Sequence, residues 1–152
     1  MFTVDASVHV NAASPTEVGA TASHTFIDQL HGRPWPVFSP TLLLAEVAAA
    51  VARNKNDTAQ GVAVAQAVRG LPGQVWVPLD DALAEVAVRL AAELRLRGAD
   101  AVYAAVVKRY GTTLVTWDRQ QLERLRTALP VLTPTEALAR LAKLAKADKR
   151  RK

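Results

Sequence analysis

Four acidic residues lie inside or at the edge of apolar runs in this chain. They are Asp5 in FTVDASV, Glu46 in LLLAEVAAAVA, Asp100 in GADAVYAAVV and Asp118 in TTLVTWD. An ionised carboxylate in such surroundings costs several kcal/mol of desolvation unless a cation compensates it. Four acids of this kind in one chain suggest that they converge on a divalent metal ion. A metal ion held by carboxylates points to the hydrolysis of phosphodiester bonds.

Each acid also has a simpler explanation when it is considered alone. Asp5 can cap a short helix that directly follows it, and Asp118 can cap the next helix together with Gln121. Asp100 lies in the first turn of an apolar helix, where the helix dipole favours a negative charge. The helix around Glu46 has no polar face, so we expect it to be largely buried. Its residues three and four positions from Glu46 offer no partner, and the alternative is a salt bridge to a distant arginine or lysine.

The residue types favour Mg²⁺ or Mn²⁺ as the bound ion, because hard carboxylate oxygens suit these ions better than zinc. The chain has no cysteine, which excludes disulfides, thiolate zinc sites and cysteine nucleophiles. His9, His24 and His31 show no ligand spacing, and surface or helix-end roles suit them better. Ser7 and Thr116 each lie two residues from an acid and can orient a carboxylate or a water, although ordinary strand-end hydroxyls are equally plausible.

The elements that must position these acids alternate between short strands and helices. We expect strands at residues 2–5, 35–38, 74–78, 112–117 and 130–133, and helices at residues 15–30, 41–53, 57–70, 80–97, 99–110, 119–128 and from 134 onward. This alternation favours an α/β domain with a parallel sheet and helices on both faces. Chemistry in such proteins lies at the C-terminal ends of the strands, and Asp5 and Asp118 both follow strands.

Three local patterns add detail to this arrangement. Pro36 cannot donate to a strand ladder, so the strand at 35–38 is expected at an edge of the sheet. The Ser-Pro-Thr-Glu pattern at 14–17 predicts a capped helix start. Glu85, Arg89, Glu93 and Arg97 recur at four-residue steps, which is typical of a solvated helix face.

Length and charge suggest one domain with a basic C-terminal tail. A chain of 152 residues can bury a core as a single domain, which we place at residues 1–140. Residues 140–152 contain seven basic residues and one acidic residue, so the net charge of +5 is mostly a property of the tail at 141–152. No membrane span or secretion signal is visible, and together with the lack of cysteine this predicts a cytoplasmic protein.

The ordered segments VDASV, LLLAEVAAAVAR and LRLRGADAVYAAVVKRYGTTLVTWDRQQL resemble the PIN domain, and specifically the VapC-type toxins of toxin–antitoxin pairs. The resemblance runs from Phe2 to about Leu138 and implies strand order 3-2-1-4-5 and metal-dependent cleavage of single-stranded or loop RNA. It also implies that the catalytic and metal-binding acids are Asp5, Glu46, Asp100 and Asp118. Thr116 matches the hydroxyl of the family's Thr-x-Asp pair, and Ser7 falls where many relatives carry a small polar residue.

The resemblance further implies a homodimer and a small antitoxin partner that covers an apolar groove. Residues 41–70 are compatible with this, because they form two alanine-rich helices with little charge. Such a pair can present a groove for an amphipathic helix or can pack in the core.

Two other functions compete with a nuclease. One is a non-catalytic PIN-like RNA-binding or assembly module whose acids hold a structural ion. The other is a phosphatase with Asp5 as covalent nucleophile, although such enzymes usually carry a second acid at the position that Ser7 occupies here. A nuclease assay with and without EDTA distinguishes the non-catalytic module from a nuclease. Trapping with beryllium fluoride tests the phosphatase.

Overall fold

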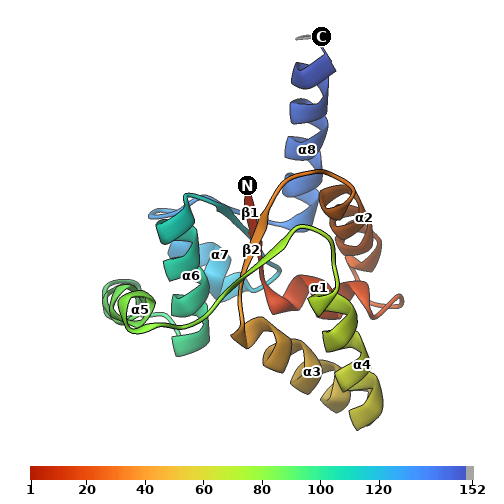
Figure 1. Ribbon diagram of the computed structural model, residues 1–152, viewed down its shortest axis with the longest axis horizontal. Helices are drawn as coiled ribbons and strands as arrows, with labels where there is room; N and C mark the ends of the chain where they lie inside the picture. The colour runs from red at the N-terminus through yellow and green to blue at the C-terminus, as the bar shows by residue number, and fades with distance from the viewer. Residues whose placement is uncertain (150–152) are drawn as a thin grey trace.

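Five short strands form one parallel sheet in the computed structural model, which describes residues 1–149 (Figure 1). The strands lie in the order β3-β2-β1-β4-β5, and all neighbours pair in parallel. They are β1 (Phe2–Val4), β2 (Val37–Pro40), β3 (Gln74–Val77), β4 (Thr113–Val115) and β5 (Val131–Leu132). The predicted α/β class and strand order are confirmed.

The two central strands bring Asp5 and Asp118 to the same edge of the sheet. β1 pairs with β4 so that Val4 lies opposite Val115. Asp5 directly follows β1, and its backbone N–H donates to the Val115 carbonyl (3.0 Å). Asp118 follows the end of β4 and begins the next helix. Because parallel strands end at the same edge, both acids lie at its C-terminal side.

The prediction that the second strand forms an edge was wrong. β2 lies between β1 and β3, with Val37 opposite both Phe2 and Gln74. The strand begins at Val37 rather than at residue 35, so Pro36 precedes the ladder and its missing N–H is not needed there. The edges of the sheet are β3 and β5.

Eight helices connect the strands within residues 1–149. They are α1 (Ala6–Ala12), α2 (Ala20–His31), α3 (Leu42–Lys55), α4 (Thr58–Arg69), α5 (Asp81–Leu94), α6 (Gly98–Tyr110), α7 (Arg119–Leu125) and α8 (Pro134–Lys149). Most boundaries are close to the predicted ones, and Asp57, Asp80 and Thr133 cap the helices that follow them. None of these helices combines the length and apolar composition that a bilayer crossing requires.

The predicted helix start at residues 14–17 was wrong, because these residues form turns and α2 begins only at Ala20. Glu17 does not close a capping box. Its carboxylate accepts a hydrogen bond from the Asn11 side chain (3.3 Å), so the segment folds back on the end of α1. The chain then enters α2 through Gly19, whose φ of +86° is a left-handed conformation that favours glycine.

Helices cover both faces of the sheet, as predicted (Figure 1). Neighbouring strand residues point to opposite faces, so Leu114 and Val115 enter different cores. The core at Leu114 takes buried side chains from α3, α4, α5, α6 and α7, whereas the core at Val115 takes them from α1, α2 and α8. Helix α6 is buried over every residue from Asp100 to Val107. The helix that carries Asp100 is therefore held firmly against the sheet.

The last helix runs without a break across the domain boundary that we expect at residue 140. α8 extends from Pro134 to Lys149, and Leu141 is fully buried against the body. The C-terminal half of α8 projects away from the sheet in Figure 1.

Helix α3 is buried on one side only, which corrects the expectation of a largely buried helix. Leu43, Val47 and Val51 face the core, whereas Ala45 and Ala49 are exposed. The helix packs closely against α4 at Gly61. A methyl group at Gly61 would lie 2.5 Å from the Ala48 carbonyl oxygen and 2.8 Å from the Ala52 Cβ. The alanine-rich sequence of α3 therefore serves a close helix–helix contact.

The first prediction concerns this contact. Gly61→Ala should lower the free energy of unfolding by about 1–3 kcal/mol, because the forced separation of α3 and α4 outweighs the better helix propensity of alanine. Gly98→Ala is the matched control, since a Cβ at Gly98 meets nothing within 4 Å. Urea unfolding measures both variants. Equal stabilities of the two would contradict the close packing at Gly61.

The second prediction concerns pH. His9 is buried, and burial, followed by the nearby charge of His31, lowers the pKa of His9 to about 3. Below pH 6.5 an unfolded histidine binds a proton that the native His9 does not, so stability falls as the pH falls from about 6.5 toward 3. By pH 5 the loss from this residue should reach about 2 kcal/mol.

Urea unfolding at pH 7.5 and pH 5.0 measures this loss. His9→Gln cannot titrate, so its stability should change less between the two pH values than that of the unmodified protein. An identical change in both proteins would show that His9 does not titrate in this way.

Candidate active site

All four acids singled out from the sequence line one cavity of about 470 Å³. The cavity lies at the C-terminal edge of the sheet, between the starts of α1, α6 and α7 and one side of α3. Its wall consists of Asp5, Ala6, Ser7, Val10, Ala45, Glu46, Ala49, Ala50, Arg53, Arg97, Asp100, Asp118 and Gln121. Residues far apart in the chain therefore meet in one place.

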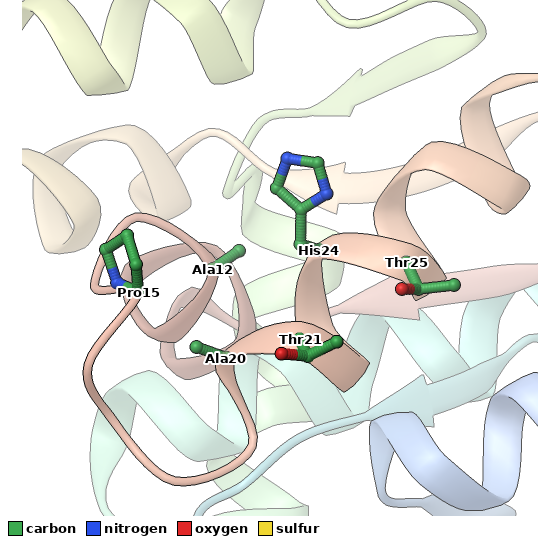
Figure 2. A pocket seen from close by; sticks show the side chains of 6 residues that line it. All are labelled: Ala12, Pro15, Ala20, Thr21, His24 and Thr25. Carbon is green, nitrogen blue, oxygen red and sulfur yellow. The ribbon is translucent and has the colours of Figure 1, made fainter.

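A second hollow, of about 300 Å³, lies beside the end of α1 and the first turns of α2 (Figure 2). Its one titratable lining residue is His24, which is exposed and pairs with Asp28 (3.0 Å). The other lining residues are small, or carry only a hydroxyl group. A single exposed histidine offers far fewer groups for metal chemistry than four acids in one wall, so the acidic cavity is the candidate site.

Asp5 is the most strongly held of the four acids. Its side chain is buried and its Oδ2 accepts hydrogen bonds from the Ser7 backbone N–H (3.0 Å) and from the Thr116 hydroxyl (3.1 Å). Its Oδ1 accepts a hydrogen bond from the Gln121 side chain (3.1 Å). Asp5 therefore caps α1, as its simpler explanation proposed, and it also lines the cavity.

Gln121 joins two of the acids. The same Nε2 that contacts Asp5 donates to Oδ1 of Asp100 (2.9 Å). Gln121 is 2% exposed, and its Oε1 is buried without a hydrogen-bond partner. From the sequence, Gln121 is expected only as a capping partner of Asp118. The available signal was its place in the first turn of a helix, three residues after a candidate acid.

Arg97 joins Asp100 to Asp118. Its Nε donates to Oδ2 of Asp100 (3.1 Å), and its Nη2 donates to Oδ2 of Asp118 (2.9 Å). The prediction of a solvated helix face at Arg97 was wrong, because α5 ends at Leu94 and Arg97 is the N-cap residue of α6. Asp118 also caps α7 through the Gln121 backbone N–H (3.0 Å), as its simpler explanation proposed.

Glu46 contacts the hydroxyl of Tyr103 rather than a base. Tyr103 is fully buried in α6 and donates to Oε2 of Glu46 (2.6 Å). The expected alternative, a salt bridge to a distant arginine or lysine, is not what the structure contains for this residue. Burial raises the pKa of Glu46, the Tyr103 hydrogen bond lowers it, and the charges of Asp5 and Asp100 raise it further.

Burial also raises the pKa of Asp100, and the charges of Asp118 and Asp5 add to this effect, whereas Gln121 and Arg97 oppose it. The carboxylates thus repel one another across the cavity. Two arginines, Arg53 and Arg97, line the same wall. Four carboxylates against two guanidinium groups leave an excess of negative charge that favours binding of a further cation.

The donor types in the cavity fit a hard divalent cation such as Mg²⁺ or Mn²⁺, since all candidate ligands are carboxylate oxygens. Within residues 1–149, however, no three acidic or histidine side chains are already gathered as ligands to one ion. Arg97 holds Oδ2 of both Asp100 and Asp118. A cation at these Oδ2 atoms would therefore lie beside the positive charge of Arg97.

The hydroxyl groups predicted to orient the acids lie among them. Thr116 Oγ1 donates to Asp5 and accepts from the Asp118 backbone N–H (2.9 Å), so it ties the two strand ends together. Ser7 Oγ lies 3.3 Å from the Thr116 hydroxyl and accepts from the Trp117 backbone N–H (3.0 Å). No role for Trp117 is expected from the sequence, and in the structure its indole N–H donates to Ser23 in α2 (2.7 Å).

Comparison with known proteins identifies the family of this chain. The family model described as PIN domain matches residues 2–128. The chain belongs to the PIN domain family. No curated protein matches the chain in sequence.

Several solved structures share this PIN fold. The toxin VapC20 of Mycobacterium tuberculosis, described as cleaving the sarcin–ricin loop, is 15% identical with a TM-score of 0.68, over 85% of this chain and 96% of that one. VapBC2 of Rickettsia felis, bound to promoter DNA, is 14% identical with a TM-score of 0.66, over 87% and 97% of the two chains. A protein from Pyrobaculum aerophilum is 24% identical with a TM-score of 0.65, over 93% and 95%. At these identities the likeness shows the fold.

The third prediction concerns the Glu46 contact. Tyr103→Phe should raise the pKa of Glu46 further, because the hydroxyl that favours the ionised carboxylate is lost. A ¹³C NMR titration of the glutamate carboxyl carbons measures this. Tyr110→Phe, on the same helix, is the control, since Tyr110 stacks on Phe38. An unchanged Glu46 titration in Tyr103→Phe would contradict the assigned contact.

Proposed function

We propose that this PIN domain is a metal-dependent endoribonuclease and the toxin of a VapBC-type toxin–antitoxin pair. The observation that carries the proposal is the convergence of Asp5, Glu46, Asp100 and Asp118 on one cavity at the C-terminal edge of the sheet. Membership of the PIN family and the likeness in fold to VapC toxins support the reaction class.

In this proposal the four acids hold Mg²⁺ or Mn²⁺. Such an ion lowers the pKa of a bound water and offsets the negative charge that grows on the phosphate during hydrolysis. Gln121 keeps Asp5 and Asp100 at a fixed separation through its amide, and Thr116 keeps Asp5 beside Asp118. Arg53 on the cavity wall binds a phosphate that flanks the scissile bond. Asp100 or Asp118 orients the attacking water.

The substrate in this proposal is RNA in single-stranded or loop form, since unstacked bases and an accessible backbone are what proteins read in RNA. Attraction of phosphates by arginines at the cavity makes binding weaker as the salt concentration rises.

The proposed partners are a small antitoxin and a second copy of the chain. The α3–α4 pair carries a hollow of about 200 Å³, which is lined by Leu44, Ala48, Val62, Ala65, Gln66 and Arg69. Val62 is 51% exposed there. An amphipathic antitoxin helix would cover this hollow with its apolar face.

One observation favours the non-catalytic alternative. Arg97 pairs with both Asp100 and Asp118, as it would in a module whose acids only hold the edge of the sheet together. A nuclease assay with and without EDTA separates the two functions, because a non-catalytic module cleaves no RNA under either condition.

The fourth prediction is the outcome of that assay. The purified chain should cleave single-stranded RNA with Mg²⁺ or Mn²⁺ and not with EDTA. Asp5→Asn and Asp100→Asn should each reduce cleavage at least about 100-fold, because several kcal/mol of charge stabilisation is lost. Their stability should stay equal or increase, since one of the mutually repelling charges is removed.

Asp28→Asn is the control, since it removes an exposed carboxylate outside the cavity. Full cleavage by both Asp5→Asn and Asp100→Asn, or cleavage that is indifferent to EDTA, would refute the proposed function. If the chain cleaves RNA as expected, sequencing of RNA ends after brief expression identifies the target.

A further inference from the structure

Arg97 occupies the position of a cation between two of the proposed metal ligands. Its guanidinium lies between Asp100 on α6 and Asp118 at the start of α7, at 3.1 Å and 2.9 Å from their Oδ2 atoms. Both carboxylates are mostly buried, with side-chain exposures of 11% and 28%, whereas the arginine side chain is 62% exposed. The arginine therefore reaches over the two acids from the solvent side.

The backbone beneath Arg97 is fixed, and its side chain is not. Arg97 is the N-cap residue of α6 with an extended conformation (φ −65°, ψ 153°), and its carbonyl accepts from the Ala101 N–H (2.9 Å). The helix that follows is buried from Asp100 to Val107. The guanidinium is linked to this rigid base by a long flexible stem, so it can leave the carboxylates without any change in the fold.

We propose that Arg97 is an internal competitor of the divalent ion, and that it lowers the affinity of the site for metal. The proposal rests on the proposed function, because it takes Asp100 and Asp118 to be ligands. An ion bound at the Oδ2 atoms that Arg97 contacts would lie beside the guanidinium, which repels a second positive charge. Displacement is feasible because the Arg97 side chain is 62% exposed, so its guanidinium can move into water when it leaves the carboxylates.

The hydrogen bonds to Asp5 and Glu46 limit the competition to Asp100 and Asp118. Asp5 accepts its hydrogen bonds from Ser7, Thr116 and Gln121, and Glu46 accepts from Tyr103. All of these donors are neutral groups, which leave the carboxylate charge in place. No cation contacts Asp5 or Glu46 through these hydrogen bonds, whereas Arg97 offsets one of the two negative charges of Asp100 and Asp118 until an ion displaces it.

The test is a titration of the whole chain with Mn²⁺ alone. Binding is measured by isothermal calorimetry, or by the loss of the free Mn²⁺ signal in electron paramagnetic resonance. Arg97→Gln should bind Mn²⁺ at least about tenfold more tightly than the unmodified protein, which corresponds to ~1.4 kcal/mol. Arg97→Lys keeps a positive charge without the planar fork, so its affinity should fall between the two. Arg89→Gln, on the exposed face of α5, is the control for net charge and should bind as the unmodified protein does.

The outcomes separate this inference from the proposed function. Equal Mn²⁺ affinity of Arg97→Gln and the unmodified protein would overturn the competition and leave the nuclease proposal standing. Absence of binding in every variant would overturn both. Weaker binding in Arg97→Gln would make the arginine a support of the site rather than a competitor.

A second measurement needs no variant and so does not depend on the folding of Arg97→Gln. The Nε–H signal of Arg97, assigned through its own side chain by NMR, should move during a Mg²⁺ titration as its bond to Asp100 breaks. It should also begin to exchange faster with solvent. A stationary signal, while the backbone amides around the cavity respond to Mg²⁺, would contradict displacement.

Discussion

Four carboxylates that face one cavity repel one another, and the protein supplies each of them with a hydrogen-bond donor or a cation. Asp5 receives donors from three residues, Asp100 and Asp118 share Arg97, and Glu46 receives the Tyr103 hydroxyl. These contacts do not remove the negative charge, and the pKa values of Glu46 and Asp100 stay raised. Repulsion between the carboxylates therefore remains in the cavity, and a bound divalent ion would offset it.

The fold keeps these charged groups close together by fixing the elements that carry them. Strands β1 and β4 pair side by side at the centre of the sheet, so the acids that follow them cannot drift apart. Helix α6 is buried along most of its length and holds both Asp100 and the hydroxyl donor of Glu46. The stability of the two cores on either side of the sheet therefore holds the acids against their mutual repulsion.

The acids could be predicted from the sequence because each one interrupts an apolar run, and the strand order followed from the resemblance to the PIN family. The residues between the acids were harder to find. Arg97 seemed to continue the charged face of α5 at a regular spacing, and only the end of that helix at Leu94 moves it to the site. Gln121 and Tyr103 act on acids that are distant in the chain, through contacts that depend on how three elements cross. Helical periodicity carries no information on such contacts.

The packing of Gly19 limits which sequences can carry this site. A side chain at that position would lie 2.8 Å from the Trp117 ring, and Trp117 directly precedes Asp118. A larger residue at 19 would push the ring, and with it the peptide that links Thr116 to Asp118. Relatives that exchange this glycine should therefore also carry a smaller residue in place of the tryptophan. The two positions should vary together although they lie 98 positions apart in the chain.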